Sequence, residues 1–152
     1  MGFQRVLIAL DASPVAVHAV EVGSELANSL RAQIALVHVV DPKGASAPEG
    51  GLPASVVLDD LRQEGRQLLK AASARIGGDP PPWEYLIEGN PSREIVKAAT
   101  EWKADLIVMG THGRSGISRA FLGSTAEWVV RHSAIPVLTV RAEKIPGTGY
   151  SN

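Results

Sequence analysis

Residues 6–14 have the sequence VLIALDASP, an unbroken apolar run followed by an aspartate, two small residues and a proline. The run Val6–Leu10 does not alternate between apolar and polar residues, which is typical of a parallel strand covered on both faces. Ser13 followed by Pro14 is typical of a helix start, with the serine as N-cap and the proline in the first turn. The stretch therefore predicts a strand that passes almost directly into a helix.

The same succession of strand and helix recurs along the chain. Four further short apolar runs predict strands, and apolar residues at helical spacing predict a helix after each of the first four strands; the further runs are Ile34–Val40, Tyr85–Ile87, Leu106–Met109 and Val137–Val140. Tyr85–Ile87 is the weakest run and is expected at a sheet edge. The order βαβαβαβαβ predicts a single-domain α/β protein, a doubly wound five-stranded parallel sheet with helices on both faces.

The composition excludes several functional classes. The 15 basic and 16 acidic residues give a net charge of −1, which argues against a surface built for nucleic acid or for a membrane. The absence of cysteine excludes disulfides, thiolate metal sites and thiol catalysis. No apolar run approaches the ~20 residues of a membrane span. Met1–Leu10 lacks the pattern of an export signal, so the expected location is the cytoplasm.

Two segments are expected to lie outside regular structure. Asp41–Ser55 contains three prolines and three glycines, which predicts a long surface loop, either a binding lid or a tolerated insertion. Residues 143–152 are expected to form a flexible tail. Residues 1–142 are then the one folded domain.

The segment Gly110–Ser124 carries the strongest chemical signal. Gly110 follows the fourth predicted strand, and Gly113 and Gly123 follow in turn; glycine permits tight turns and lets backbone N–H groups approach an anion. Ser124–Glu127 has the pattern of a capping box, so a helix is expected to begin right after Gly123. The unpaired N–H groups of a helix start bind anions. The segment therefore predicts an anion site.

The side chains of this segment extend the prediction to phosphate. Arg114 could add a charge-assisted contact, and the hydroxyls of Ser124 and Thr125 could reach phosphate or its metal. The alternatives are that the glycines are plain turn residues and that Ser124 is only an N-cap. The segment is neither a Walker P-loop nor a GxGxxG motif, so the pattern alone does not name the ligand.

Topology brings Asp11 into the same region. In a doubly wound sheet the ligand crevice lies at the carboxyl ends of the strands, where the winding reverses. If the first and fourth strands are neighbours, Asp11 faces Gly110 across this crevice. A carboxylate there suits a divalent metal or a hydroxyl or amine donor of the ligand. The alternative is that Asp11 only caps the first helical turn.

The spacing Gly110-x2-Gly113-x9-Gly123-Ser124 resembles the ATP-binding signature of the universal stress protein family. The apolar segments also resemble that family, so the likeness covers almost the whole chain; the matching segments are residues 6–13, 37–40, 107–110 and 135–140. The resemblance implies a sheet of order 3-2-1-4-5, a homodimer through strand five (Val137–Val140), and ATP between strands one and four. Ala12 stands where the family often has glycine, a mild departure.

The resemblance also implies the residues of the ATP site. The adenosine would contact Asp11 and Val39, and the phosphates would lie along the glycine segment. The full set of implied binding residues is Ala9, Asp11, Val39, Met109, Gly110, Gly113, Arg114, Gly123, Ser124 and Thr125.

The implied function is that of an ATP-binding stress-response protein, a nucleotide-dependent switch or partner-binding module that takes ATP with Mg²⁺. The alternative is a slow ATPase or autophosphorylating enzyme, and a third reading is a partner protein with a vestigial pocket. Asp11, Asp41 and His112 are candidate bases, but none stands in a recognisable catalytic motif. His38 is expected to face the core. No histidine pair has the spacing of a zinc site.

Overall fold

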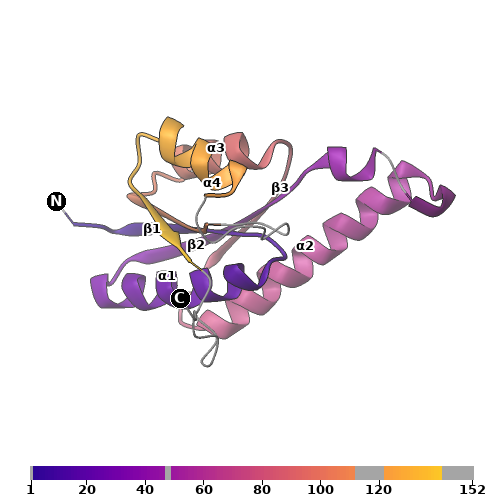
Figure 1. Cartoon of the computed structure of the whole chain (residues 1–152). Helices are drawn as coiled ribbons and strands as arrows, with labels where there is room; N and C mark the ends of the chain where they lie inside the picture. The colour runs from indigo at the N-terminus through magenta and orange to yellow at the C-terminus, as the bar shows by residue number, and fades with distance from the viewer. Residues whose placement is uncertain (1, 47–48, 112–121, 142–152) are drawn as a thin grey trace, which may run out of the picture.

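Strands and α-helices alternate within residues 2–46, 49–111 and 122–141, the part of the chain that the computed structural model describes (Figure 1). The expected tail at 143–152 lies outside these residues. In chain order the elements are β1 (Arg5–Leu10), α1 (Pro14–Leu30), β2 (Gln33–Val40), the 3₁₀ turns η1 (Pro42–Ala45) and η2 (Glu49–Gly51), α2 (Ala54–Ile76), β3 (Trp83–Glu88), α3 (Pro91–Glu101), β4 (Leu106–Gly110), α4 (Ser124–His132) and β5 (Val137–Val140).

The five strands pair in parallel in the order β3-β2-β1-β4-β5. β1 pairs with β2 on one side and with β4 on the other, so the winding of the chain reverses between β1 and β4. β3 and β5 are the two edge strands. The predicted fold class, the strand order and the edge position of the third strand are therefore confirmed.

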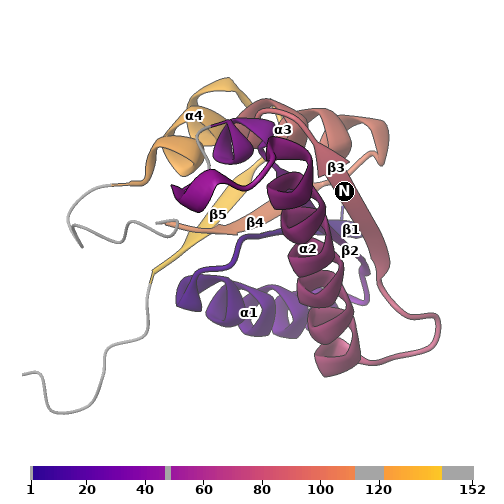
Figure 2. The same ribbon diagram turned by 90° about the vertical axis from the view of Figure 1, so that its right-hand side faces the viewer.

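The core lies in two layers, one on each face of the sheet. Leu7 and Ile8 are neighbours on β1 and are both fully buried, but their side chains point to opposite faces. Ile8 packs in the cluster that includes α1 and α2, and Leu7 packs in the cluster that includes α3 and α4. Figures 1 and 2 show the two helix pairs on either side of the sheet. Burial on both faces explains why the strands have no alternating pattern.

Helix α2 approaches the sheet closely because of a glycine at its middle. A Cβ on Gly65 would lie 2.7 Å from Cδ2 of His38 and 2.7 Å from Cδ1 of Leu86. A larger residue at this position would push the helix away from β2 and β3. Gly65 therefore fixes how near α2 lies to the His38 ring.

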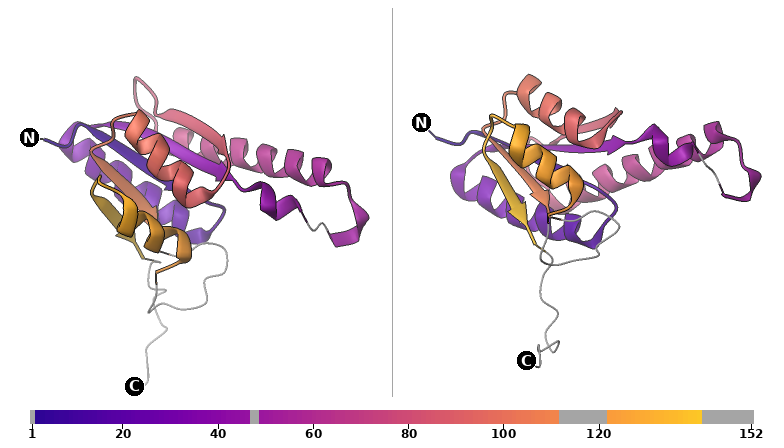
Figure 3. Two further views of the ribbon diagram at one scale, coloured as in Figure 1. Left: turned by 90° about the horizontal axis from the view of Figure 1, so that it is seen from above. Right: turned by 45° about the horizontal axis from the view of Figure 1, so that its top comes forward.

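The segment Asp41–Ser55 is more ordered than the sequence predicts. It holds the two 3₁₀ turns, and α2 already begins at Ala54. The carboxylate of Asp41 accepts the N–H of Lys43 at 3.0 Å and so starts η1 directly after β2. The prediction of one long irregular loop was wrong, because Asp41 caps a 3₁₀ turn directly after β2 and α2 already includes Ala54 and Ser55. Figure 3 shows the first turns of α2, with η1 and η2, reaching beyond the end of the sheet.

Within the described part of the chain, no helix is both long enough and apolar enough to cross a membrane.

Candidate functional site

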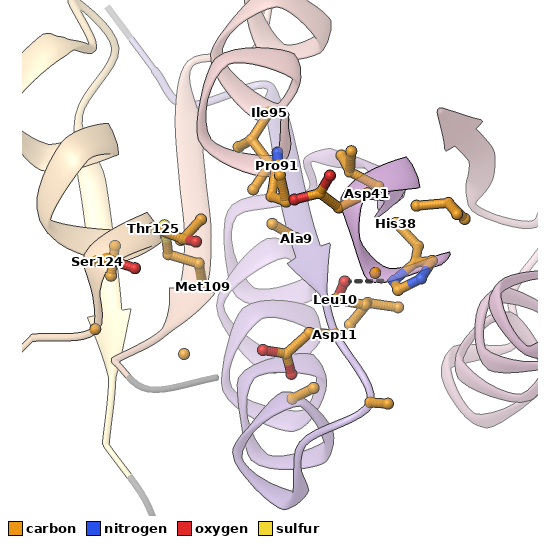
Figure 4. A pocket seen from close by; sticks show the side chains of 18 of the residues that line it. Ala9, Leu10, Asp11, His38, Asp41, Pro91, Ile95, Met109, Ser124 and Thr125 are labelled. Atoms are coloured by element: carbon orange, nitrogen blue, oxygen red, sulfur yellow. Dashed lines mark hydrogen bonds between the residues drawn. The ribbon is translucent and has the colours of Figure 1, made fainter. Parts of the chain in front are cut away.

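A pocket of about 380 Å³ lies where the chain reverses its winding, at the carboxyl ends of β1, β2 and β4. This is the position at which open α/β sheets bind ligands. Ala9 and Met109, which are paired on β1 and β4, lie at its centre (Figure 4). The sheet alone therefore positions the pocket, and the turns after each strand supply its polar groups.

Most of the residues that the resemblance implies for ATP line this pocket. They are Ala9, Asp11, Val39, Met109, Gly110, Gly123, Ser124 and Thr125. Gly113 and Arg114, like His112, lie outside the described residues. Sequence positions more than a hundred apart thus meet in one cavity, and the binding role of each residue stays a prediction.

Asp11 both forms the local turn before α1 and lines the pocket. One oxygen of its carboxylate, Oδ1, accepts the backbone N–H of Ser13 at 2.9 Å and also the Ser13 hydroxyl. The residue lines the pocket at the same time. Asp11 therefore both shapes the entry into α1 and presents a carboxylate to the cavity.

Ser13 does not cap α1 as expected. It occupies the N-cap position in extended conformation, but its side chain makes no capping hydrogen bond to the helix. The hydroxyl donates to Asp11 instead. The expected position was correct and the expected contact was wrong: the hydroxyl is turned toward the Asp11 carboxylate, a strong acceptor, and its oxygen does not accept from the N–H groups of α1.

Asp41 is a pocket residue that the resemblance did not include. It follows β2 as Asp11 follows β1, and its carboxylate accepts a backbone N–H two residues further on. The signal was available, since an aspartate placed directly after a buried parallel strand lies at the same edge of the sheet as Asp11. Figure 4 shows Asp41 on the opposite side of the pocket from Ser124 and Thr125.

His38 is half-buried and lines the pocket, although the sequence placed it in the core. Its Nδ1 lies 2.8 Å from the carbonyl oxygen of Leu10, the last residue of β1 (Figure 4). The other side of the ring packs against Gly65 of α2. His38 thus links α2 to the end of β1, and only the packing of α2 could reveal this contact.

The start of α4 faces the pocket from the side of β4. Gly123 is the N-cap and its carbonyl oxygen accepts the N–H of Glu127, the first intrahelical bond. Ser124, Thr125 and Ala126 occupy the first three helical positions, whose N–H groups have no acceptor within a helix. All three residues line the pocket. The helix begins right after Gly123 as predicted, but the predicted capping box was wrong by one residue, since the cap is the glycine.

Gly123 is held in place by the strand beside it. Its N–H donates to the carbonyl oxygen of Thr111, and the Thr111 N–H donates to the carbonyl oxygen of Val140 at 2.9 Å. Thr111 is buried and also lines the pocket. The first turn of α4 is therefore tied to the ends of β4 and β5, and the Gly123 N–H is used within the protein.

The described lining has a charge of one sign. Asp11, Asp41 and Glu64 are acidic, and the described lining residues include no lysine or arginine. Among the described residues, no three His, Cys, Asp or Glu side chains converge as a metal site.

A doubly wound sheet with a small-ligand pocket at its switch point defines a class of α/β binding proteins. The model of the Universal stress protein family matches residues 2–141. This chain belongs to the universal stress protein family.

Individual relatives agree with this assignment. Universal stress protein MJ0531 of Methanocaldococcus jannaschii is 36% identical over 148 residues, which are 93% of this chain and 84% of the relative. A universal stress protein family structure from Burkholderia pseudomallei is similar with a TM-score of 0.73 and 34% identity, over 92% of this chain and 97% of the other. A universal stress protein crystallised in complex with cAMP has a TM-score of 0.72 and 27% identity, over 94% of this chain and 100% of the other.

Proposed function

We propose that this protein binds ATP in the pocket between β1 and β4 and acts as a nucleotide-dependent switch in the stress response. The observation that carries the proposal is that hydrogen-bond donors and carboxylate acceptors lie on opposite sides of one cavity. Three helix-start N–H groups, of Ser124, Thr125 and Ala126, lie on one side, and the carboxylates of Asp11 and Asp41 lie on the other. A nucleotide has anionic phosphates at one end and neutral donors, the ribose hydroxyls and base amine, at the other.

This contrast sets the orientation of the ligand. The phosphates lie at the start of α4, beside Gly110. Gly113 and Arg114 lie outside the described residues, and their contact with phosphate is proposed from the glycine spacing alone. The adenosine lies against Ala9, Val39 and Met109, where the pocket is apolar, with Asp11 accepting from the ribose; these three apolar residues come from β1, β2 and β4. The carboxylates of Asp11 and Asp41 repel a phosphate group placed at their side of the pocket, which disfavours the reverse orientation of the ligand.

The relative in complex with cAMP supports adenine nucleotides as the ligand class. cAMP has the adenine and ribose of ATP but a single cyclic phosphate, so this likeness does not favour a triphosphate over a monophosphate. The proposal of ATP with Mg²⁺ rests on the glycine spacing and on the length of the segment between Gly110 and Ser124.

A switch is favoured over an enzyme by where the carboxylates lie. Asp11 and Asp41, the candidate bases in the described part of the chain, are on the nucleoside side and face α4 across the pocket (Figure 4). A base for hydrolysis must reach the water beside the terminal phosphate. Slow hydrolysis or autophosphorylation remains the alternative that the experiment below separates.

The decisive experiment is titration calorimetry of nucleotide-free protein with ATP, ADP, cAMP, GTP, adenosine and inorganic triphosphate, with and without Mg²⁺. We expect ATP to bind more tightly than GTP and adenosine. Equal affinity for ATP and inorganic triphosphate, or no binding of any nucleotide, would contradict the proposal. Mass spectrometry of gently purified protein is the companion measurement: retained ATP supports the switch, and retained ADP or AMP supports the enzyme.

We also propose a cytoplasmic homodimer joined through β5. The two sheet edges differ: β3 follows three consecutive prolines and carries Glu84 and Glu88, whereas β5 reads Val-Leu-Thr-Val with no charge. Prolines and charges protect an edge from pairing, and an uncharged edge invites it. Two copies pairing antiparallel would satisfy both edges by one repeated patch.

The ladder between β4 and β5 provides a sharp test of the dimer. The carbonyl oxygens of Pro136 and Val140 accept from β4, so in a parallel ladder the N–H of Thr139, between them, points outward. Thr139→Pro removes that outward donor and leaves the β4 ladder intact. We expect light scattering to give twice the 16.0 kDa of one chain for the parent and one chain for the variant. A parent of one-chain mass at micromolar concentration would overturn the dimer.

A further inference from the structure

Each of the first three strands is followed by an Asp or Asn whose side chain accepts a backbone N–H. Asp11, Asp41 and Asn90 follow the ends of β1, β2 and β3, and in each the side-chain oxygen accepts a backbone N–H two or three residues further along. These turns start the following helix or 3₁₀ turn. Asp11 and Asp41 line the pocket, whereas Asn90 does not.

A hydroxyl reinforces two of these three turns. The Ser13 hydroxyl donates to Asp11 Oδ1, and the Ser92 hydroxyl donates to Asn90 Oδ1 at 2.7 Å. The two serines differ in burial: Ser13 is 5% exposed, whereas Ser92 is half-buried. Only the Ser13 hydroxyl therefore acts on a side chain of the pocket.

We infer that Ser13 is a positioning residue, which fixes the Asp11 carboxylate so that one oxygen faces the ligand. Oδ1 accepts both the N–H and the hydroxyl of Ser13, and Oδ2 has no hydrogen bond within the described residues. A carboxylate held by two donors on one oxygen loses its torsional freedom before the ligand arrives, which removes an ordering cost from binding. The ligand meets a single acceptor with a fixed direction.

This inference rests on the proposed nucleotide binding and adds the group that orients its acceptor. The hydroxyl is not used for the helix that it precedes, since Ser13 makes no capping bond to α1. Ser13 is also buried, so its contact with Asp11 is protected from water. A serine used only as a helix cap would show the opposite pattern.

The test is a double-mutant cycle on ATP affinity with Ser13→Ala, Asp11→Ala and the double variant. We expect Ser13→Ala to weaken binding about three- to fivefold, less than the loss of the Asp11 carboxylate itself, because the freed side chain must then be ordered when the ligand binds. In the Asp11→Ala background the same change should have less than about a twofold effect, because the two residues act as one unit. Ser13→Thr, which keeps the hydroxyl, should restore the affinity. Should Ser13→Ala fail to fold, Ser13→Cys replaces it, since a thiol is a weak donor.

Ser92→Ala is the matched control. It removes the equivalent hydroxyl from the turn after β3, so it should lower the melting temperature by no more than Ser13→Ala and leave ATP affinity unchanged. A Ser13→Ala protein that binds ATP like the parent, or a loss that persists when Asp11 is alanine, would overturn the inference.

A measurement without nucleotide separates this inference from the proposed function. Three-bond proton couplings of Asp11 in the ligand-free protein should report one side-chain rotamer in the parent and averaging in Ser13→Ala. If the parent binds no nucleotide while the couplings change in this way, the proposed function fails and the positioning role stands. Unchanged couplings overturn the positioning role whatever the protein binds.

Discussion

The two sides of the pocket begin at the same edge of the sheet, but one side presents hydrogen-bond acceptors and the other presents hydrogen-bond donors. On one side, β1 and β2 end in Asp11 and Asp41, whose carboxylates accept hydrogen bonds. On the other, β4 leads through Thr111 and Gly123 to α4, whose first N–H groups donate. In the proposed function, side chains bind the ligand on the first side and backbone N–H groups bind it on the second.

The difference teaches which substitutions each side tolerates. An acceptor built from a side chain is lost when that residue changes, so the nucleoside side depends on the identity of Asp11. Donors built from backbone persist whatever the side chain is, so the phosphate side depends on space, which the N-cap glycine preserves. The predictions below test this asymmetry.

The largest effect is expected from a side chain at Gly123. Its backbone angles, φ −60° and ψ 156°, are accessible to valine, so Gly123→Val should keep the fold. The branched side chain would stand beside the helix-start N–H groups, and we expect a loss of ATP affinity of at least about tenfold, near 1.4 kcal/mol. Calorimetry with adenosine should show no change.

Two comparisons check this prediction. Gly113→Val, outside the described residues, should act in the same direction if the glycine segment holds phosphate. An equal loss for adenosine and ATP would mean that Gly123 shapes the whole pocket and not its phosphate side.

The second-largest loss of ATP affinity is expected from Asp11→Ala, on the proposed nucleoside side. Losing one acceptor for a ligand donor should weaken ATP and adenosine alike, by about five- to tenfold. Because the carboxylate is assigned to the nucleoside, the ratio between variant and parent should be the same in Mg²⁺ and in EDTA. A loss that appears only with Mg²⁺ would instead make Asp11 a metal ligand.

The smallest effect on binding is expected from Gly65→Ala in α2. The added methyl group would meet Cδ2 of His38 and Cδ1 of Leu86 at 2.7 Å, so the helix or the histidine must shift. Overpacking of this kind costs about 1–3 kcal/mol of stability. ATP affinity should fall about two- to threefold, since His38 lines the nucleoside side.

Gln67→Ala on the exposed face of α2 is the control for helix propensity, and urea unfolding is the measurement. A Gly65→Ala protein more stable than the parent by the roughly 1 kcal/mol that alanine gains over glycine within a helix would show that α2 is not held against β2 by this contact.

The sequence by itself determined the fold and half of the site. Continuous Val, Ile and Leu runs are what burial on both faces demands, and the succession of strand and helix leaves few alternatives to a parallel doubly wound sheet. The positions of Asp11 and Gly123 could also be predicted from the sequence, because a turn residue after a strand and a glycine before a helix depend on local geometry. The position of a helix start after Gly123 was right for the same reason.

Only the tertiary structure decided the other half. His38 enters the pocket because Gly65, on a different element, lets α2 press its ring toward the end of β1. Thr111 matters because it joins Gly123 to β5. The Ser13 hydroxyl donates to Asp11, and its oxygen accepts no N–H from α1; a residue pattern does not show which of these contacts the side chain makes. Local patterns fix which element a residue starts or ends, but partners across the fold depend on how elements pack, and packing is set by side-chain volumes far apart in the chain.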